Sequence, residues 1–257
     1  MAFRIREEQL AEFRRSALAD FENEMILHSK SFSPKLSEVL GDDQLRIAVR
    51  QAMDRAAKYG FTNRGPIRLY IELMFLCGSD FDTDPQYPEI GKVLNSSEDQ
   101  MDRANRICDG VSEYIEKVAG EKNVNVRSAE KFLAEFARFP LNISESDFSE
   151  SIAREMTNAY PQKTAYVGNE NLNRLIGEGR IEARKHDFEA VRAQVLVVVL
   201  MFAFGHGCAN DPLYPWIGRT LRDEKIMDSQ ARALRLEKKA ITWLDHVLAG
   251  NKEGATE

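Results

Sequence analysis

The chain repeats itself at a spacing of 127 residues, and this internal repeat constrains its fold more than any other feature. Residues 73–94 align without a gap on residues 200–221, and 11 of these 22 positions are identical. Both blocks begin with Leu-Met-Phe and later carry Asp-Pro-x-Tyr-Pro-x-Ile-Gly. Weaker matches at the same spacing include Phe21 with Phe148 and Phe61 with Phe188. The sequence therefore predicts two tandem copies of one structural unit.

Hydrophobic residues recur at helical spacing in both copies. Leu10, Phe13, Leu18, Phe21 and Met25, for example, form one stripe at the three- to five-residue intervals of a single helix face. We expect an all-α fold with about five helices in each copy. The expected helices span about 7–28, 42–60, 66–77, 84–94 and 97–120 in the first copy, and 129–138, 146–160, 169–185, 188–204, 212–221 and 226–248 in the second.

The copies define the expected domain organisation. Residues 1–120 form the first helical repeat, residues 121–127 a polar linker, residues 128–250 the second repeat and residues 251–257 a disordered tail. Because neighbouring repeats usually bury apolar faces against each other, we expect one body with approximate twofold symmetry.

Composition narrows the class of protein. A net charge of −6 and a pI near 5.5 disfavour nucleic acid as the main partner, because phosphate binding draws on an excess of Lys and Arg. The apolar run from Val195 to Phe204 is too short to cross a bilayer, and the charged N-terminus lacks the apolar core of a signal peptide. We therefore expect a soluble, cytoplasmic protein that does not bind membranes.

The repeated Asp-Pro-x-Tyr-Pro-x-Ile-Gly motif is interpreted as a structural joint and not as an active site. Asp before Pro is typical of a helix N-cap, and the Tyr ring can wedge a short helix against the preceding long one. A corner of the fold is needed in each repeat, whereas an active site is usually needed once. The expected joint residues are Asp84, Pro85, Tyr87, Pro88 and Gly91 in the first copy and Asp211, Pro212, Tyr214, Pro215 and Gly218 in the second.

Alternating carboxylates precede the first motif, at Asp80, Asp82 and Asp84. They resemble the start of a calcium loop, but Pro85 stands where such a loop needs Gly and the second copy does not keep the pattern. We expect no metal here. A charged loop or a negative rim for a basic partner explains the pattern better.

A catalytic constellation is not evident. His206 and Cys208 lie two residues apart in a glycine-rich turn, where side chains seldom face each other. The three cysteines form no C-x-x-C pair, and the remaining histidines lack a second ligand at i+3 or i+4. We therefore expect no cofactor and no enzymatic activity.

Several segments of the first copy resemble uncharacterised bacterial proteins encoded beside the toxins and spike proteins of type VI secretion systems. They are Phe13-Arg-Arg-x-Ala-Leu-x-x-Phe21, Arg55-Ala-Ala-x-Tyr-Gly60, Leu73-Met-Phe75 and Asp80-Phe-Asp-x-Asp-Pro85. The resemblance implies an immunity protein or a loading chaperone, and neither class has a catalytic residue to carry over.

The leading functional hypothesis is a protein-binding module, specifically an immunity protein that neutralises a cognate toxin or effector. Asp80, Asp82 and Glu89 are the candidate partner-binding residues. One alternative is a toxin-loading chaperone or adaptor. Another is a small enzyme or ligand-binding protein with a pocket between the copies, near His206 and Tyr87.

Overall fold

The computed structural model describes residues 7–138 and 143–253, and all regular secondary structure in these residues is helical. The expectation of an all-α fold is confirmed. The helices in chain order are α1 (Glu7–Phe32), α2 (Pro34–Lys58), α3 (Arg64–Cys77), α4 (Pro88–Leu94), α5 (Gln100–Tyr114), the π-helical turn η1 (Ile115–Ala119), the 3₁₀ turn η2 (Glu121–Asn123), α6 (Val124–Phe136), α7 (Phe148–Ala159), α8 (Pro161–Val167), α9 (Asn169–Lys185), α10 (Val191–Phe204), α11 (Pro215–Leu221) and α12 (Ser229–Glu253).

Some helix ends differ from the expected ones because of local capping. Residues 161–167 form α8, where no helix was expected, because Pro161 begins a new helix at its first turn. Asp99 caps α5 through the backbone N–H of Met101, whereas the Gln100 side chain accepts hydrogen bonds from Thr62 and its neighbour. Helix α5 therefore begins at Gln100 and not at residue 97, where the helix was expected to start.

The expected linker and tail are partly helical. Residues 121–127 contain η2 and the start of α6. Of the tail expected at 251–257, residues 251–253 belong to α12, and residues 254–257 lie outside the described residues.

Backbone conformations recur at the 127-residue spacing. Helices α3 and α10 have corresponding bounds, as do α4 and α11. Gly41 has φ +72°, and Gly168 has φ +77°. Gly78 and Gly205, which end α3 and α10, have φ +93° and +94°. Positive φ at a non-glycine residue is costly, so each of these turns favours glycine for the same reason.

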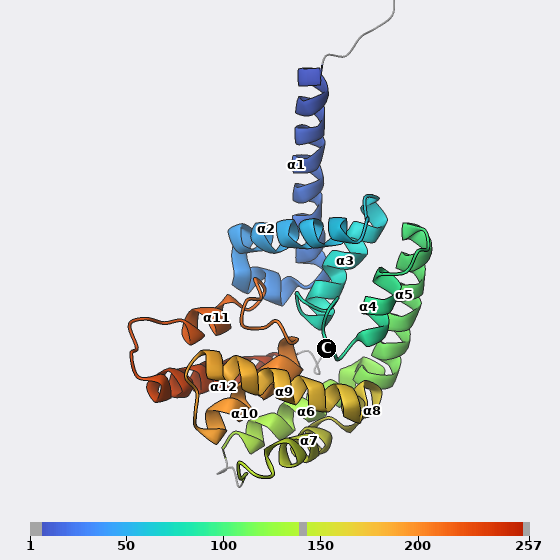
Figure 1. Cartoon of the computed structure of the whole chain (residues 1–257). Helices are drawn as coiled ribbons and strands as arrows, with labels where there is room; N and C mark the ends of the chain where they lie inside the picture. Colours follow the sequence, from blue (N-terminus) through green and yellow to red (C-terminus); the bar gives the residue numbers. More distant parts are fainter. Residues whose placement is uncertain (1–6, 139–142, 254–257) are drawn as a thin grey trace, which may run out of the picture.

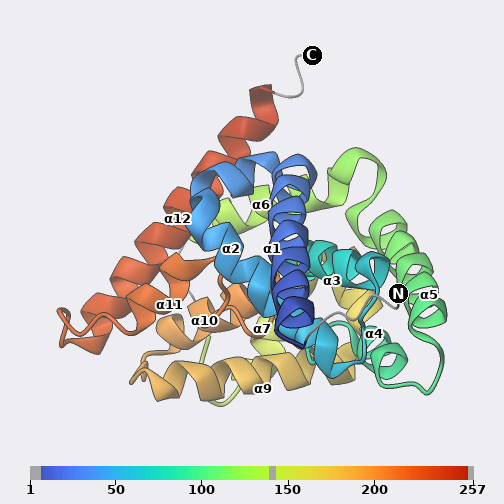
Figure 2. The ribbon, with the colours of Figure 1, turned by 90° about the horizontal axis from the view of Figure 1, so that it is seen from above.

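Two hydrophobic clusters fill the interior, and most of the helices that build them lie one set above the other in Figure 1. The first is built mainly from α1, α2, α3 and α5, and the second from α7, α9, α10 and α12. Seen from above in Figure 2, α12 and α5 flank the body on opposite sides. The clusters meet at the loops that follow α3 and α10.

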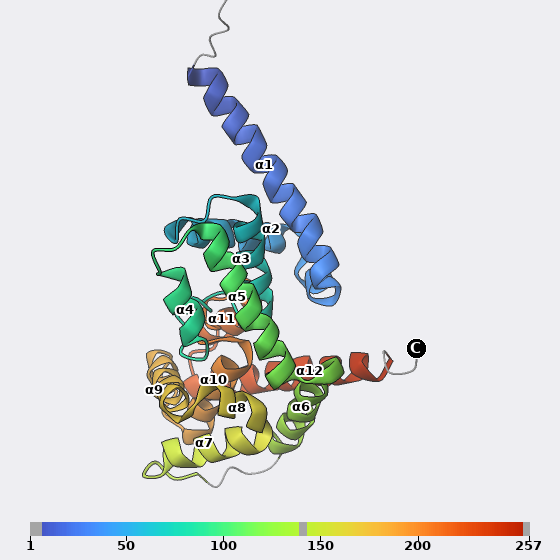
Figure 3. The ribbon, with the colours of Figure 1, turned by 90° about the vertical axis from the view of Figure 1, so that its right-hand side faces the viewer.

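Helix α1 extends well beyond this body. Its C-terminal half packs beside α2, and its N-terminal half stands clear of the other helices in Figures 1 and 3. Within the described residues, none of the helices has the length and apolar character required to traverse a bilayer.

Candidate functional site

The turns after α3 and α10 touch through their backbones. A Cβ atom on Gly78 would lie 2.2 Å from the carbonyl oxygen of Phe204, and one on Gly205 would lie 2.8 Å from that of Cys77. Both distances are shorter than real Cβ contacts. The two positions therefore need glycine for close approach as well as for positive φ.

The Asp residues of the two motifs form reciprocal hydrogen bonds across this contact. Asp84 accepts the backbone N–H of His206 at 2.7 Å, and Asp211 accepts that of Ser79 at 2.9 Å. Ser79 and His206 are themselves 127 residues apart. Burial raises the pKa of Asp84, and it raises that of Asp211 to about 6 against the opposing effect of the backbone donors.

The motif Asp residues do not cap the short helices, contrary to the sequence expectation. Helices α4 and α11 begin at Pro88 and Pro215, and their N-cap residues are Tyr87 and Tyr214. Each Asp instead accepts the backbone N–H two residues further on, for example that of Gln86 at 2.8 Å. This local turn delays the helix, because Asp side chains stabilise turns as readily as helix starts.

Each copy of the motif also places one side chain against the opposite hydrophobic core. Leu213 belongs to the first hydrophobic cluster, although it follows α10 in the second copy. The matching residue, Gln86, is fully buried and donates to the carbonyl oxygen of Met201 in α10 at 3.1 Å. The Tyr87 ring packs edge-on against Tyr114. Packing of this kind couples the two cores at their boundary.

The remaining joint residues lie in the same two loops. Pro85 and Pro212 follow the Asp residues, and the carbonyl oxygen of Pro212 accepts a hydrogen bond from Gln44 in α2. A Cβ on Gly91 would lie 2.9 Å from the carbonyl oxygen of Asp82, and one on Gly218 would lie 2.3 Å from that of Ala209. Each glycine therefore lets its short helix pack tightly on the preceding loop.

The three expected partner-binding carboxylates have different environments. Arg55 forms ion pairs with both Asp80 and Asp82. Asp82 is buried and also accepts hydrogen bonds from the hydroxyls of Tyr59 and Tyr70, at 2.9 and 2.8 Å. Asp80 and Asp82 thus have partners within the chain.

Glu89 is the exposed member of this set. Its carboxylate pairs with Lys92 one turn further along α4. Such exposed pairs contribute little to stability, so this carboxylate can exchange its partner at little cost.

His206 and Cys208, which lie two residues apart, have different surroundings. The His206 ring lies 3.2 Å from a Glu178 carboxylate oxygen and 3.1 Å from the Thr83 hydroxyl. Cys208 is buried, and burial raises the pKa of its thiol far above the range in which a thiolate forms. Glu178, a partner that sequence reasoning could not foresee, lies within hydrogen-bond distance of the imidazole.

A groove opens beside the first motif, where the alternative of a pocket between the copies was expected. It has a volume of about 390 Å³, and its lining includes Asp84, Tyr87, Lys92 and Arg174. Among the described residues, no group of three or more His, Cys, Asp or Glu side chains is placed to hold a metal ion. The groove is open and polar, and ligand binding there stays a prediction.

Lys163 is a buried cation that sequence reasoning missed. It lies in α8, is 6% exposed, and its ammonium donates to the carbonyl oxygen of Phe202. Burial lowers the pKa of Lys163 to about 8, although the charge of Asp84 acts in the opposite direction. The repeat gives no signal for this residue, because the position 127 residues earlier is Leu36 and not a lysine.

We expect Lys163→Met to stabilise the protein at pH 7 by about 2 kcal/mol, since it removes a buried charge whose lowered pKa reflects a desolvation cost. The native protein should also gain stability between about pH 8 and the unfolded-state value of 10.5, because its folded state releases this proton first. The variant should lack that gain. Urea unfolding of both proteins at neutral and alkaline pH measures these effects. A less stable variant at pH 7 would show that the ammonium is favourable where it lies.

The exposed half of α1 carries apolar side chains. Phe21 and Met25 are buried against the body. The same stripe continues towards the N-terminus through Leu18, Ala17 and Phe13, and Leu18 and Phe13 are 55% and 65% exposed. An apolar stripe with one half buried and one half bare is typical of a helix that binds a further partner.

A similar segment in the second copy has a different packing environment. The sequence Leu-Ala-Glu-Phe occurs at residues 10–13 in α1 and again at residues 133–136 in α6, a spacing four residues shorter than that of the main repeat. Helix α6 folds back, so Leu133 and Phe136 face α10 and α12. In the first copy α1 runs on without a break, and Phe13 finds no such cover.

Comparisons of the chain with models of protein families, with curated proteins and with solved structures found no match.

Proposed function

We propose that this protein is a protein-binding module built from two tandem copies of one helical unit with approximate twofold symmetry, joined through the repeated motif. The equal φ angles at Gly78 and Gly205 support the duplication. The reciprocal hydrogen bonds of Asp84 and Asp211 support the joint. Neither motif then needs to be an active site.

The observation that carries the binding role is the bare apolar half of α1. Exposure of apolar side chains such as Phe13 and Leu18 to water is unfavourable, and a partner that covers them lowers the free energy. A helix of this kind is recognised when its apolar face enters a groove on another protein. The occupant of this surface is therefore a protein that presents an apolar groove.

The partner is a basic toxin or effector, and the module is an immunity protein that neutralises it. The net charge of −6 disfavours self-association and favours a partner of opposite charge. Asp20 is exposed on α1 next to Phe21 of the apolar stripe, and Glu12 is exposed on the same helix, where it pairs with Arg15. Basic residues at the rim of the partner's groove would meet them and speed association.

Substitution of the stripe tests this role. We expect Phe13→Ser with Leu18→Ser to weaken binding of the purified partner by about a hundredfold, since two well-packed apolar anchors contribute about 1–2 kcal/mol each. The partner is first captured with the tagged wild-type protein and then titrated against both proteins by calorimetry. Met227→Ser, at an 86% exposed apolar residue away from α1, should bind like the wild type.

Equal weakening by Met227→Ser, or none by the double variant, would reject α1 as the binding surface. Assembly into a dimer that the double variant abolishes would identify a second copy as the occupant instead. Co-expression then separates the two protein-binding roles. An immunity protein restores growth of bacteria that produce the toxin, whereas a loading chaperone leaves the bound toxin active.

A further inference from the structure

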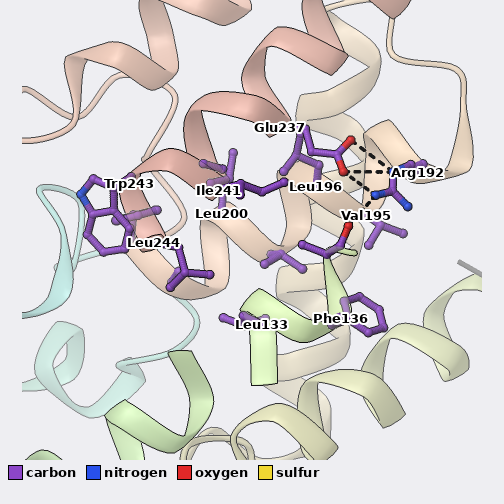
Figure 4. Close-up of a pocket in the computed structure, with 15 residues that line it drawn as sticks. Leu133, Phe136, Arg192, Val195, Leu196, Leu200, Glu237, Ile241, Trp243 and Leu244 are labelled. Carbon is purple, nitrogen blue, oxygen red and sulfur yellow. Dashed lines mark hydrogen bonds and ion pairs between the residues drawn. The ribbon is translucent and has the colours of Figure 1, made fainter. Parts of the chain in front are cut away.

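An apolar pocket lies in the second copy, between α6, α10 and α12. The pocket has a volume of about 110 Å³ (Figure 4). Its walls are almost entirely apolar and include Leu133 and Phe136 from α6, Val195 and Val199 from α10, and Trp243 and Leu244 from α12. Such walls favour an apolar molecule over water, because contact between water and apolar surface is unfavourable.

The fold does not require this pocket. At the positions 127 residues earlier, α3 has Arg68 and Glu72 where α10 has Val195 and Val199. Arg68 and Glu72 pair with each other at the surface of the first copy. Glu72 also bonds with His28 of α1, so the same backbone carries a polar contact at these positions. An unfilled apolar space is destabilising, and α3 has polar residues at the two matching positions, so the space beside α10 points to an occupant.

One end of the pocket is polar. Arg192 forms an ion pair with Glu237 and donates to the carbonyl oxygen of Ala137 at 2.9 Å. Figure 4 shows this pair at one side of the apolar walls. Because Arg192 and Glu237 neutralise each other, this end of the pocket offers no net charge to attract a charged ligand. A ligand hydroxyl can still donate a hydrogen bond to the Glu237 carboxylate.

We propose that this pocket binds a small neutral amphipathic molecule, with an apolar body the size of one aromatic ring and one hydrogen-bond donor that reaches Glu237. The volume sets the size, since an engineered apolar cavity of about 150 Å³ holds benzene. The site is separate from the stripe on α1. Ligand binding and partner binding can therefore fail independently.

The test uses 4-methylphenol as the probe and Trp243 as the reporter. In a Trp216→Phe background Trp243 is the single tryptophan, and its emission should change on titration with a Kd of about 1 mM or tighter. Toluene, which lacks the donor, and 4-methylbenzoate, which is charged, should each bind at least about tenfold more weakly. Equal binding of toluene would overturn the role of Glu237.

A filled pocket gives the matching control. Val199→Phe should abolish the emission change and raise Tm without ligand, because the ring occupies the space. Val39→Phe, at an exposed position of α2, should bind like the parent. If Val199→Phe fails to fold, Ala203→Leu fills the same pocket with a smaller change. Absence of any emission change or Tm shift in the parent at about 10 mM probe would overturn the proposal.

Discussion

Arg55→Met is expected to lower the free energy of unfolding by about 3–5 kcal/mol, because it leaves the buried Asp82 carboxylate without its cation. The guanidinium pairs with Asp80 and Asp82 and also donates to the Tyr70 hydroxyl at 3.3 Å. Burial alone would lower the pKa of Arg55, but the two carboxylates outweigh it and raise the pKa. The loss should appear as a lower midpoint in urea unfolding at pH 7.

A second substitution distinguishes an uncompensated charge from lost packing. Arg55→Met combined with Asp82→Asn should recover about half of the loss, since the amide carries no charge. Arg174→Met removes an exposed pair with Glu178 and should cost less than about 1 kcal/mol. A loss of similar size at Arg55 and Arg174 would contradict the importance of burial.

Gly78→Ala is expected to cost about 3 kcal/mol or more. The new methyl group would lie 2.2 Å from the carbonyl oxygen of Phe204, which belongs to a helix backbone and cannot move aside freely. The positive φ of Gly78 adds backbone strain for any side chain. Tm and urea midpoints of the variant measure the loss.

Gly177→Ala is the matched control. Gly177 lies in α9 with nothing within 4 Å of a new Cβ, so alanine should stabilise that helix by up to about 1 kcal/mol. Gly205→Ala should behave like Gly78→Ala, because its methyl group would meet the Cys77 carbonyl oxygen. A neutral effect at both turn glycines would show that the two loops can separate without loss of stability.

Helical periodicity correctly predicted the all-α fold and most long helices. It failed where local hydrogen bonds compete with helix formation. Asp84-Pro85 read as a helix start, yet the Asp84 side chain forms a turn with Gln86 and the helix begins at Pro88. An Asp side chain can either cap a helix or form a turn. For Asp84 the choice depends on a second hydrogen-bond partner, the backbone N–H of His206, which is far away in the sequence.

The candidate sites were foreseen unevenly. The sequence predicts Asp80 and Asp82 at a negative rim; in the structure Arg55 forms ion pairs with both, and Tyr70 donates a hydrogen bond to the buried Asp82. Lys163 was missed, because a lysine on a helix is usually solvated and only packing shows that it is buried.

The sequence by itself determined the helical class and the 127-residue repeat, because hydrophobic periodicity and self-similarity are properties of the residue order and do not depend on tertiary contacts. Only the tertiary structure decided that Asp84 and Asp211 bond to the opposite loop, that α6 packs against α12 while the start of α1 stays bare, and that a pocket remains in the second copy. These features depend on how helices distant in sequence pack, and packing is fixed by the whole set of side chains at once.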